Sequence, residues 1–339
     1  MENIKIVVPS YYTIEEGALS LIAESERTFT EMMKEVGIAE LHSFEESGVV
    51  LEAVNVKQTI NNIIAWFKET FETFRGYLEE ALRKIKNEIN KQKRNILNQA
   101  KIEEAVKNLK DDKEYGKTYE YKELGWARNV DSASEQSHWK AIHDFRAAVK
   151  KAYDSKDEDI KNIVEDGKKK LNERFGATDT DRLSAIKKFL RGEEVKVTKE
   201  YLMTNRKWNI IRDAALNYNN AAAKMKKDYN ALKKETDAII ADIKKAEKEL
   251  EKGDKQGFND YINGFKATQS YMRDFASATI ACINEQVRFS VMLCLRLSLA
   301  WKKKEEADKK AEEKAEVKQE SAVVESTKFE SELSTLFDF

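Results

Sequence analysis

The chain has 339 residues, of which 41% are hydrophobic and 36% are charged, with a single proline and 12 glycines. Average domains carry about 25% charged residues, roughly 5% proline and about 7% glycine. Twelve glycines are too few for a parallel-sheet enzyme of this length, which needs a turn after nearly every strand. The 15 Phe, 12 Tyr and 5 Trp can build a core, which excludes a wholly disordered chain. The composition therefore predicts an all-α fold: an elongated bundle of long antiparallel helices with a small irregular N-terminal region and a charged C-terminal tail.

Charge is balanced overall but uneven along the chain. The formal net charge of −1 provides no global field that would recruit nucleic acid or an anionic membrane. Residues 1–56 hold three basic residues and eleven glutamates, a net of −8, whereas residues 57–110 hold twelve basic and seven acidic residues, a net of +5. This contrast indicates either an acidic arm that docks on the body or detaches from it, or an ordinary drift of charge along solvated faces.

The acidic N-terminal arm, residues 1–56, is the least regular part. Asn3–Val8 is expected to be a short strand or an extended stretch. Thr13–Val36 is expected to be a helix, with Thr13 as its N-cap and Glu16 three residues later, as in a capping box. The N-terminus lacks the basic leader and the apolar run of a signal peptide, so secretion is not expected.

The body, residues 57–301, starts with the strongest helical periodicity in the chain. Apolar residues spaced by three and four predict one helix from Val56 to Leu109, about 80 Å long at about 1.5 Å per residue. The stripe comprises Ile60, Ile63, Ile64, Phe67, Phe71, Phe74, Leu78, Leu82, Ile85 and Ile89. Residues 110–136 interrupt the pattern and are expected to form a compact loop or a small hairpin.

Helical spacing returns after this interruption. A helix is expected from Ser137 through Leu171, followed by a short one over Asp181–Arg191 that ends at Gly192. Two long helices then follow, over Thr198–Lys252 and from Phe258 to Trp301 and beyond. The turn at 251–257 makes them an antiparallel pair.

Both cysteines, Cys282 and Cys294, lie in the last of these helices. Twelve residues of helix separate them by about 18 Å, whereas a disulfide requires Cα atoms about 4.4–6.8 Å apart. They are therefore expected to be small buried apolar residues in a reducing compartment.

The C-terminal end divides into a charged spacer, residues 302–318, and a tip, residues 319–339. The spacer has seven lysines and six acidic residues and is expected to be either a solvated helical extension or disordered. Apolar residues return in the tip with helical spacing, which indicates either a docking peptide or a frayed tail. The partner-binding residues in the docking interpretation are Phe329, Leu333, Leu336, Phe337 and Phe339.

The sequence offers little for catalysis, a metal or a cofactor. The three histidines are His42, His138 and His143, and the last two are five residues apart, a spacing that does not align ligands on one helix face. The glycine-rich phosphate-binding motifs and the Gly-x-Ser-x-Gly motif are missing from the sequence. We therefore expect no enzyme, no metal site and no cofactor.

Two basic clusters raise the question of nucleic-acid binding. Acidic residues are interleaved with them and aromatic residues for base stacking are not beside them, so solvated helix faces are the favoured interpretation. The clusters are Arg83, Lys84, Lys86, Lys91, Lys93 and Arg94, and Lys224, Lys226, Lys227, Lys233 and Lys234.

The most apolar stretch, residues 279–301, is long enough to span a bilayer. It contains Glu285, Arg288 and Arg296, each costing about 2.5–3.5 kcal/mol on membrane insertion. A helix that is apolar almost all round is usually buried by neighbouring helices. A bundle-core helix is therefore expected, and insertion into a membrane is the alternative.

The stretch EEGALSLIAESERTFTEMMKEVGIAELHSFEESG resembles the opening of helical virion proteins of tailed bacteriophages with large genomes. The resemblance covers about 50 residues. It implies an acidic leader that a prohead protease removes by cutting after Ile/Leu-x-Glu, which Ile22-Ala23-Glu24 and Ile38-Ala39-Glu40 match. Glu24 and Glu40 are thus the processing positions that the resemblance implies.

These observations lead to a non-enzymatic structural or assembly protein, a bacteriophage virion or head-associated component acting through helix packing and protein–protein contacts. Its expected partners are other virion proteins or copies of itself, with nucleic acid less favoured, and its expected location is the virion assembled in the host cytoplasm. The alternative is a pore-forming or membrane-interacting helical bundle that uses residues 279–301. A membrane is a partner only in that alternative.

Overall fold

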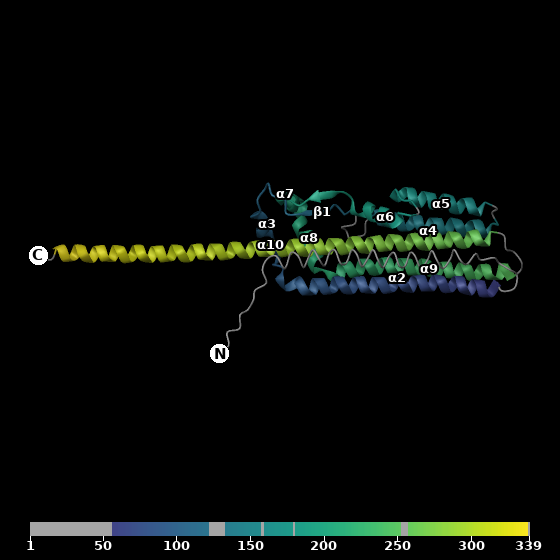
Figure 1. Cartoon of the computed structure of the whole chain (residues 1–339), viewed down its shortest axis with the longest axis horizontal. Coiled ribbons are helices and arrows are strands. Elements are labelled where there is room, and N and C mark those ends of the chain that lie inside the picture. Colours follow the sequence, from purple (N-terminus) through teal and green to yellow (C-terminus); the bar gives the residue numbers. More distant parts are fainter. Residues whose placement is uncertain (1–55, 122–132, 157–158, 179, 252–256, 338–339) are drawn as a thin grey trace, which may run out of the picture.

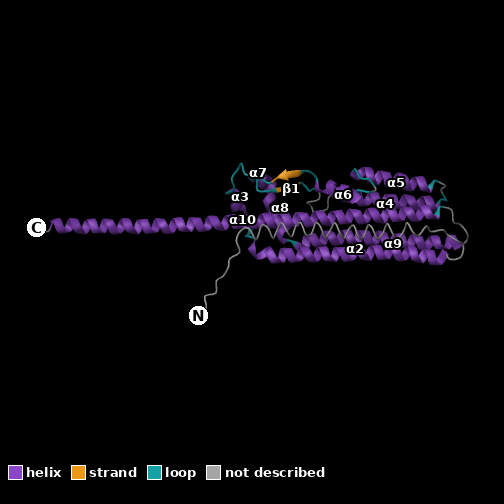
Figure 2. Cartoon of the chain, in the orientation of Figure 1, coloured by secondary structure: helices purple, strands orange, loops and turns teal. Residues whose placement is uncertain are grey.

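The computed structural model of the chain describes residues 56–121, 133–156, 159–178, 180–251 and 257–337. Over these residues the fold is all-α, as the composition predicts, and the described strands form one short ribbon (Figure 2). The elements in chain order are α2 (Val56–Gln92), η1 (Lys93–Asn95), α3 (Gln99–Lys107), β1 (Lys117–Tyr119), α4 (Ala133–Asp154), α5 (Ile160–Phe175), α6 (Arg182–Arg191), β2 (Glu194–Lys196), α7 (Lys199–Met203), η3 (Thr204–Arg206), α8 (Lys207–Leu216), α9 (Tyr218–Glu251) and α10 (Phe258–Phe337).

The molecule is elongated, and α10 is its axis (Figure 1). Helices α2 and α9 lie along one side of α10, and α4, α5 and α6 lie along the other. Helices α3, α7 and α8 and the β-ribbon gather near the point where α10 leaves the body. The rest of α10 extends beyond every other described element as a single straight helix.

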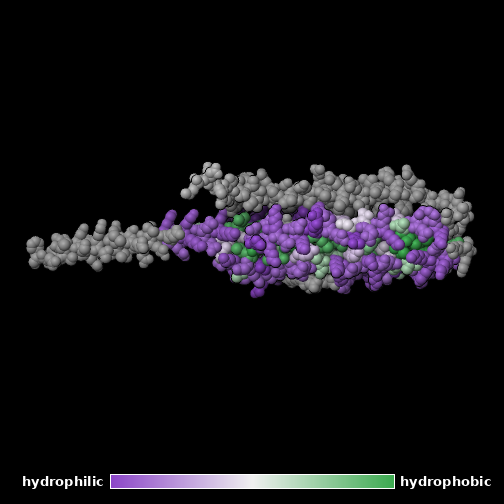
Figure 3. Space-filling view, turned by 90° about the horizontal axis from the view of Figure 1, so that it is seen from below, coloured by the Kyte–Doolittle hydropathy of each residue, from purple (hydrophilic) through white to green (hydrophobic). Residues whose placement is uncertain are grey.

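The predicted apolar stripe on α2 is confirmed. Ile63 and Phe71 are each 7% exposed, and Phe67 is fully buried. The ring of Phe71 lies 5.2 Å from that of Tyr229 on α9. Seen from below, the surface of the described body is mostly hydrophilic, with apolar residues in separate patches (Figure 3).

The single helix predicted over 56–109 is wrong beyond Gln92. Helix α2 ends there, and α3 starts after Asn98. The side chain of Asn98 caps α3 by accepting a hydrogen bond from the backbone N of Lys101 at 3.0 Å. Asparagine competes with the helical backbone for hydrogen bonds, so it starts a new helix here, where the apolar spacing only loosens.

The single helix predicted over 198–252 is also wrong. It is divided into α7, η3, α8 and α9. Asn205 and Arg206 both have φ of 52°, a left-handed conformation that an α-helix does not accommodate. A second break falls at Asn217, between α8 and α9. The antiparallel pair is confirmed for α9 and α10, whose connecting residues 252–256 lie outside the described part.

Residues 110–136 were expected to form a compact loop or a small hairpin. The described residues of this segment do not form a hairpin with one another. Strand β1 pairs instead with the distant β2, antiparallel, with Thr118 opposite Val195. Residues 122–132 lie outside the described part. The stretch expected as one helix through Leu171 is two helices, α4 and α5, with Lys156 at φ of 55° between them.

The short helix predicted over 181–191 is confirmed as α6. Gly192 follows it with φ of 70°, a conformation that glycine adopts readily. The expectations for Asn3–Val8, Thr13–Val36 and His42, and the acidic arm apart from Val56, lie outside the described residues.

The segment 279–301 lies in the core of the bundle. Ile280, Ile283 and Val287 are each at most 1% exposed. Cys282 and Cys294 are not joined by a disulfide and are buried, as predicted, and burial raises the pKa of the Cys294 thiol to about 12.

Candidate functional site: the projecting half of α10 and its anchorage

Helix α10 has two halves with different surroundings. It is 80 residues long, and residues 258–301 lie inside the body, whereas residues 302–337 extend beyond it (Figure 1). Residues 302–312 are all exposed. At about 1.5 Å per residue the projecting half is about 54 Å long. The charged spacer is therefore a helical extension, one of the two forms expected for it.

The sequence of the spacer explains why it is helical in water. Alanines and alternating lysines and glutamates favour a helix, and Glu305 pairs with Lys309 one turn later, with 3.9 Å between the charged atoms. Each such pair contributes only about 0.2–0.5 kcal/mol. Because α10 is already formed inside the bundle, its extension avoids the cost of helix nucleation.

The predicted docking residues fall at the far end of this helix. The backbone of α10 is helical through Phe337, which includes Phe329, Leu333 and Leu336. Their side chains, and Phe339 as a whole, lie outside what the structure describes, so their role in partner binding stays a prediction. The same holds for Glu24 and Glu40 as processing positions.

An aromatic cluster anchors the buried half of α10. The ring of Phe275 lies 5.5 Å from both His138 and Trp139 of α4 and 6.2 Å from Phe175 of α5. His138 is 3% exposed and takes part in this packing. Arg174 also donates a hydrogen bond to its Nδ1 at 2.5 Å. Its surroundings are those of a core histidine.

Three arginines join helices across the body, and we call Arg146, Arg182 and Arg191 the clamp arginines. Two of them, Arg182 and Arg191 of α6, contact α10. Arg182 Nε donates to Asp274 Oδ2 at 2.6 Å, and a second nitrogen donates to Ser270. Its guanidinium lies 4.2 Å from the ring centroid of Tyr271. Asp274 is 5% exposed, so this pair is buried between α6 and α10.

The second contact to α10 is centred on Glu285. Arg191 Nε donates to Glu285 Oε2 at 2.7 Å, Lys187 Nζ lies 2.6 Å from Oε1, and the Tyr121 hydroxyl donates at 3.4 Å. Burial would raise the pKa of the Glu285 carboxyl, but the hydrogen bonds and charges of Arg191 and Lys187 outweigh it. The pKa of Glu285 is therefore below its ordinary value.

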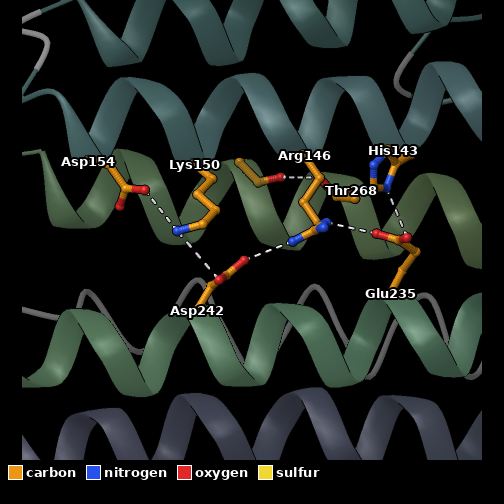
Figure 4. Close-up of polar contacts among 8 residues, drawn as sticks. His143, Arg146, Lys150, Asp154, Glu235, Asp242 and Thr268 are labelled. Atoms are coloured by element: carbon orange, nitrogen blue, oxygen red, sulfur yellow. Dashed lines mark hydrogen bonds and ion pairs between the residues drawn. The ribbon is translucent and has the colours of Figure 1, made fainter.

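The third clamp arginine, Arg146, joins α4 to α9 (Figure 4). Its Nε donates to Glu235 at 2.7 Å and another nitrogen donates to Asp242 at 2.8 Å. Lys150 lies 3.5 Å from the other oxygen of Asp242, and His143 Nδ1 lies 3.0 Å from Glu235. Two carboxylates and three nitrogen-bearing side chains thus form one network between the two helices.

One residue of the second basic cluster is not on a solvated face. Lys224 is 7% exposed and pairs with the buried Asp228 at 2.8 Å. Trp139 Nε1 donates to the same carboxylate at 3.4 Å. The expectation of a solvated face is therefore wrong for Lys224. By contrast, Arg83 is exposed and pairs with Glu80 of its own helix.

These groups join helices of the body to one another. In the part of the chain that the structure describes, no three His, Cys, Asp or Glu side chains gather as a metal site requires. Sequence reasoning missed the clamp arginines. The available signal was the presence of two acidic residues, Asp274 and Glu285, inside a largely apolar helix. Buried charges are usually paired, so each of these carboxylates indicated a basic partner on another helix.

No family model, curated protein or solved structure matches the chain. The arguments for function therefore rest on its own residues. What those residues define is a clamped helical body with one long helix extending from it.

Proposed function

We propose that the chain is a non-enzymatic assembly protein, a bacteriophage virion or head-associated component that acts through helix packing and protein contacts. The observation that carries this proposal is the division of α10 into a buried half and a projecting half. Because the buried half of α10 is part of the core of the body, a partner bound at the far end of the same helix would be held at a fixed position relative to the body. The partners are other virion proteins or copies of this chain.

The composition of the tip, residues 319–337, supports the proposal that it packs against a partner. Residues 319–337 contain four serines, two threonines and two adjacent valines, all with lower helix propensity than the alanine, lysine and glutamate of the spacer. A segment of this kind gains most of its helical stability from packing of an apolar face. The apolar residues available for such packing are Phe329, Leu333, Leu336 and Phe337.

The rigidity of the body supports the same proposal. The clamp arginines fix α4 to α9 and α6 to α10 through charge-assisted hydrogen bonds. These bonds join α4, α6, α9 and α10 into one body from which the projecting helix extends. The virion placement itself rests on the resemblance of the N-terminal stretch.

Mass spectrometry of purified virus particles tests the proposal. Particles made with the wild-type chain should contain it, and particles made with a Leu333→Ser/Leu336→Ser variant should contain much less of it. A matched control, Ser331→Ala/Ser334→Ala, changes the same two turns of helix without removing apolar area and should be incorporated normally. Equal incorporation of all three chains would contradict a docking role for the tip.

The alternative is a membrane-interacting bundle, and one observation favours it. Within the described residues, the Phe258–Glu312 stretch of α10 is long enough to cross a membrane, and its most apolar 18-residue window has a mean hydropathy of 1.2. However, 67% of its most apolar window is buried inside the bundle, as in the core helix of a protein in water. Dye release from liposomes separates the alternatives, because an assembly protein should leave vesicles intact whereas a pore-forming bundle should empty them.

A further inference from the structure

The projecting half of α10, residues 302–337, has no other described element beside it (Figure 1). Its side chains from 302 to 312 are exposed on every side of the helix. A second helix can therefore lie along it over its whole length of about 54 Å.

One face of this helix carries alanines near the body and large apolar residues near the far end. Phe329 and Leu333 follow Ala311 and Ala315 by 18 residues, which are about five full turns, so all four lie on the same face. Ala307 lies one turn before Ala311, and both are exposed. The face therefore has small residues in its first half and large ones in its second half.

We propose that two copies of the chain pair through their projecting helices in antiparallel orientation, with Phe329 of each copy against Ala311 of the other and Leu333 against Ala307. This inference rests on the proposed docking role of the tip and names its partner, the projecting helix of a second copy. The pair is isologous, because the same contacts occur once on each side of a twofold axis.

Side-chain size favours the antiparallel orientation. In a parallel pair in register each residue lies level with its own copy, so Phe329 would meet Phe329 and Ala311 would meet Ala311. The distance between the helix axes depends on the side chains at the contact, so the axes would diverge toward the tip. In the antiparallel pair each large side chain meets a small one, so the axes keep one separation along the whole contact.

The length of the projecting half sets the same register. A contact between Phe329 and Ala311 centres the pair on residue 320, which is midway between them. Residues 302–337 have their own midpoint between 319 and 320. Both helices are therefore covered from end to end, and the end of each lies just outside the body of the other copy.

Charge disfavours the parallel alternative. Residues 319–337 contain four glutamates and one lysine, a net of −3, so a parallel pair would bring two acidic segments together. Residues 302–310 contain five lysines and three acidic residues, a net of +2. The antiparallel pair places each acidic segment beside this stretch of the other copy.

Disulfide formation between two variants of the full chain tests the orientation and the register. Residues 315 and 325 lie opposite each other in the proposed pair, and neither is a large apolar residue. Ala315→Cys and Glu325→Cys chains, mixed in a glutathione buffer, should form a disulfide between these positions that mass spectrometry identifies. Neither variant should cross-link to itself, because each residue lies about 15 Å along the axis from its own copy, whereas a disulfide requires Cα atoms about 4.4–6.8 Å apart.

A mixture of Glu313→Cys and Thr327→Cys chains is the matched control. These two residues also lie level with each other in the proposed pair, but on the sides of the two helices that face apart, so the mixture should not cross-link. The wild-type chain reports any disulfide of the buried Cys282 and Cys294. A disulfide formed by Ala315→Cys alone would show a parallel pair and would overturn the proposal, as would equal cross-linking of the test and control mixtures.

Sedimentation equilibrium of full chains gives a second test. The wild-type chain should form dimers as its concentration rises and return to single chains on dilution. Phe329→Ser/Leu333→Ser, outside the body, should raise the dissociation constant at least about tenfold through lost apolar contact, whereas Ser331→Ala/Ser334→Ala should leave it unchanged. A chain that stays single at every concentration would overturn the proposal.

These measurements separate the pairing from the proposed function. A single chain whose incorporation into virus particles still depends on Leu333 and Leu336 would mean that the tip binds another virion protein, and only the pairing would be wrong. A chain that forms the 315–325 disulfide but is missing from purified particles would support the pairing and contradict the virion placement.

Discussion

Arg191, the last residue of α6, donates two hydrogen bonds to Glu285 of α10, a residue 94 positions later in the chain. The two side chains are 23% and 20% exposed, so water screens the pair only partly. Lys187, one turn before Arg191, contacts the same carboxylate at 2.6 Å. This one acidic side chain therefore fixes α6 against the buried half of the central helix.

Replacing Glu285 with glutamine should destabilise the body. The variant Glu285→Gln leaves Arg191 and Lys187 without their negative partner in a mostly buried place, and we expect a loss of about 2 kcal/mol in the free energy of unfolding. Chemical denaturation followed by circular dichroism measures this loss. The matched control is Glu305→Gln on the projecting helix, where an exposed pair is worth less than about 0.5 kcal/mol. Equal losses in the two variants would contradict the role assigned to Glu285.

The contribution of Glu285 should depend on pH with a defined sign. Its pKa in the folded protein is lowered from the ordinary value of 4.5, so the unfolded chain binds the proton more tightly. The stabilisation is therefore fully present above about pH 5 and is lost as the pH falls through the folded-state pKa. The difference in unfolding free energy between the wild type and Glu285→Gln should shrink on acidification. A difference that grew in acid would refute this assignment.

Two glycines in helices should respond to alanine in opposite directions. A Cβ on Gly264 of α10 would lie 2.6 Å from a methyl carbon of Val149 and 3.0 Å from one of Val164, whereas a Cβ on Gly76 of α2 meets nothing within 4 Å. Gly264→Ala should cost about 1–3 kcal/mol through overpacking. Gly76→Ala should add about 0.5–1 kcal/mol through helix propensity. Melting temperatures that shift in the same direction would show that α10 does not approach α4 and α5 this closely.

The buried face of α2 is tested by a charge placed on each side of the helix. Phe71→Asp puts a carboxylate among buried side chains and should cost several kcal/mol. Lys68→Asp changes an exposed residue of the same helix and should shift stability by less than about 0.5 kcal/mol. Urea denaturation of both variants measures the contrast, and similar midpoints would mean that the face is wrongly assigned.

The long helices could be predicted from the sequence because their apolar spacing is regular over many turns. The breaks within them could not, because the apolar spacing only loosens around Asn98 and continues across Asn217. Side-chain capping by Asn98 and Asn217 and the left-handed conformation of Asn205 interrupt the predicted helices, and asparagine is also common on exposed helix faces. The pairing of Thr118 with Val195 joins segments far apart in the chain, which no local pattern contains.

The polar contacts were the least predictable part. Lys224 and Lys226 belong to the same basic run, yet Lys224 is buried against Asp228 and Lys226 is exposed. Which of two lysines is buried depends on the neighbouring helix, in this case on Trp139 of α4. The sequence of the charged spacer predicted either a solvated helical extension or disorder, because its composition is compatible with both. The extension of α10 beyond the body was therefore predictable only as one of these two alternatives.

The central claim is that α10 serves both as the core of the body and as a straight extension from it. Small-angle X-ray scattering of the full chain and of a chain ending at Trp301 tests it most directly. The account predicts that truncation shortens the longest dimension by about 50 Å, from 36 residues at about 1.5 Å each, while the melting temperature of the body changes little. A longest dimension that stays the same, or a truncated chain that no longer folds, would contradict the account.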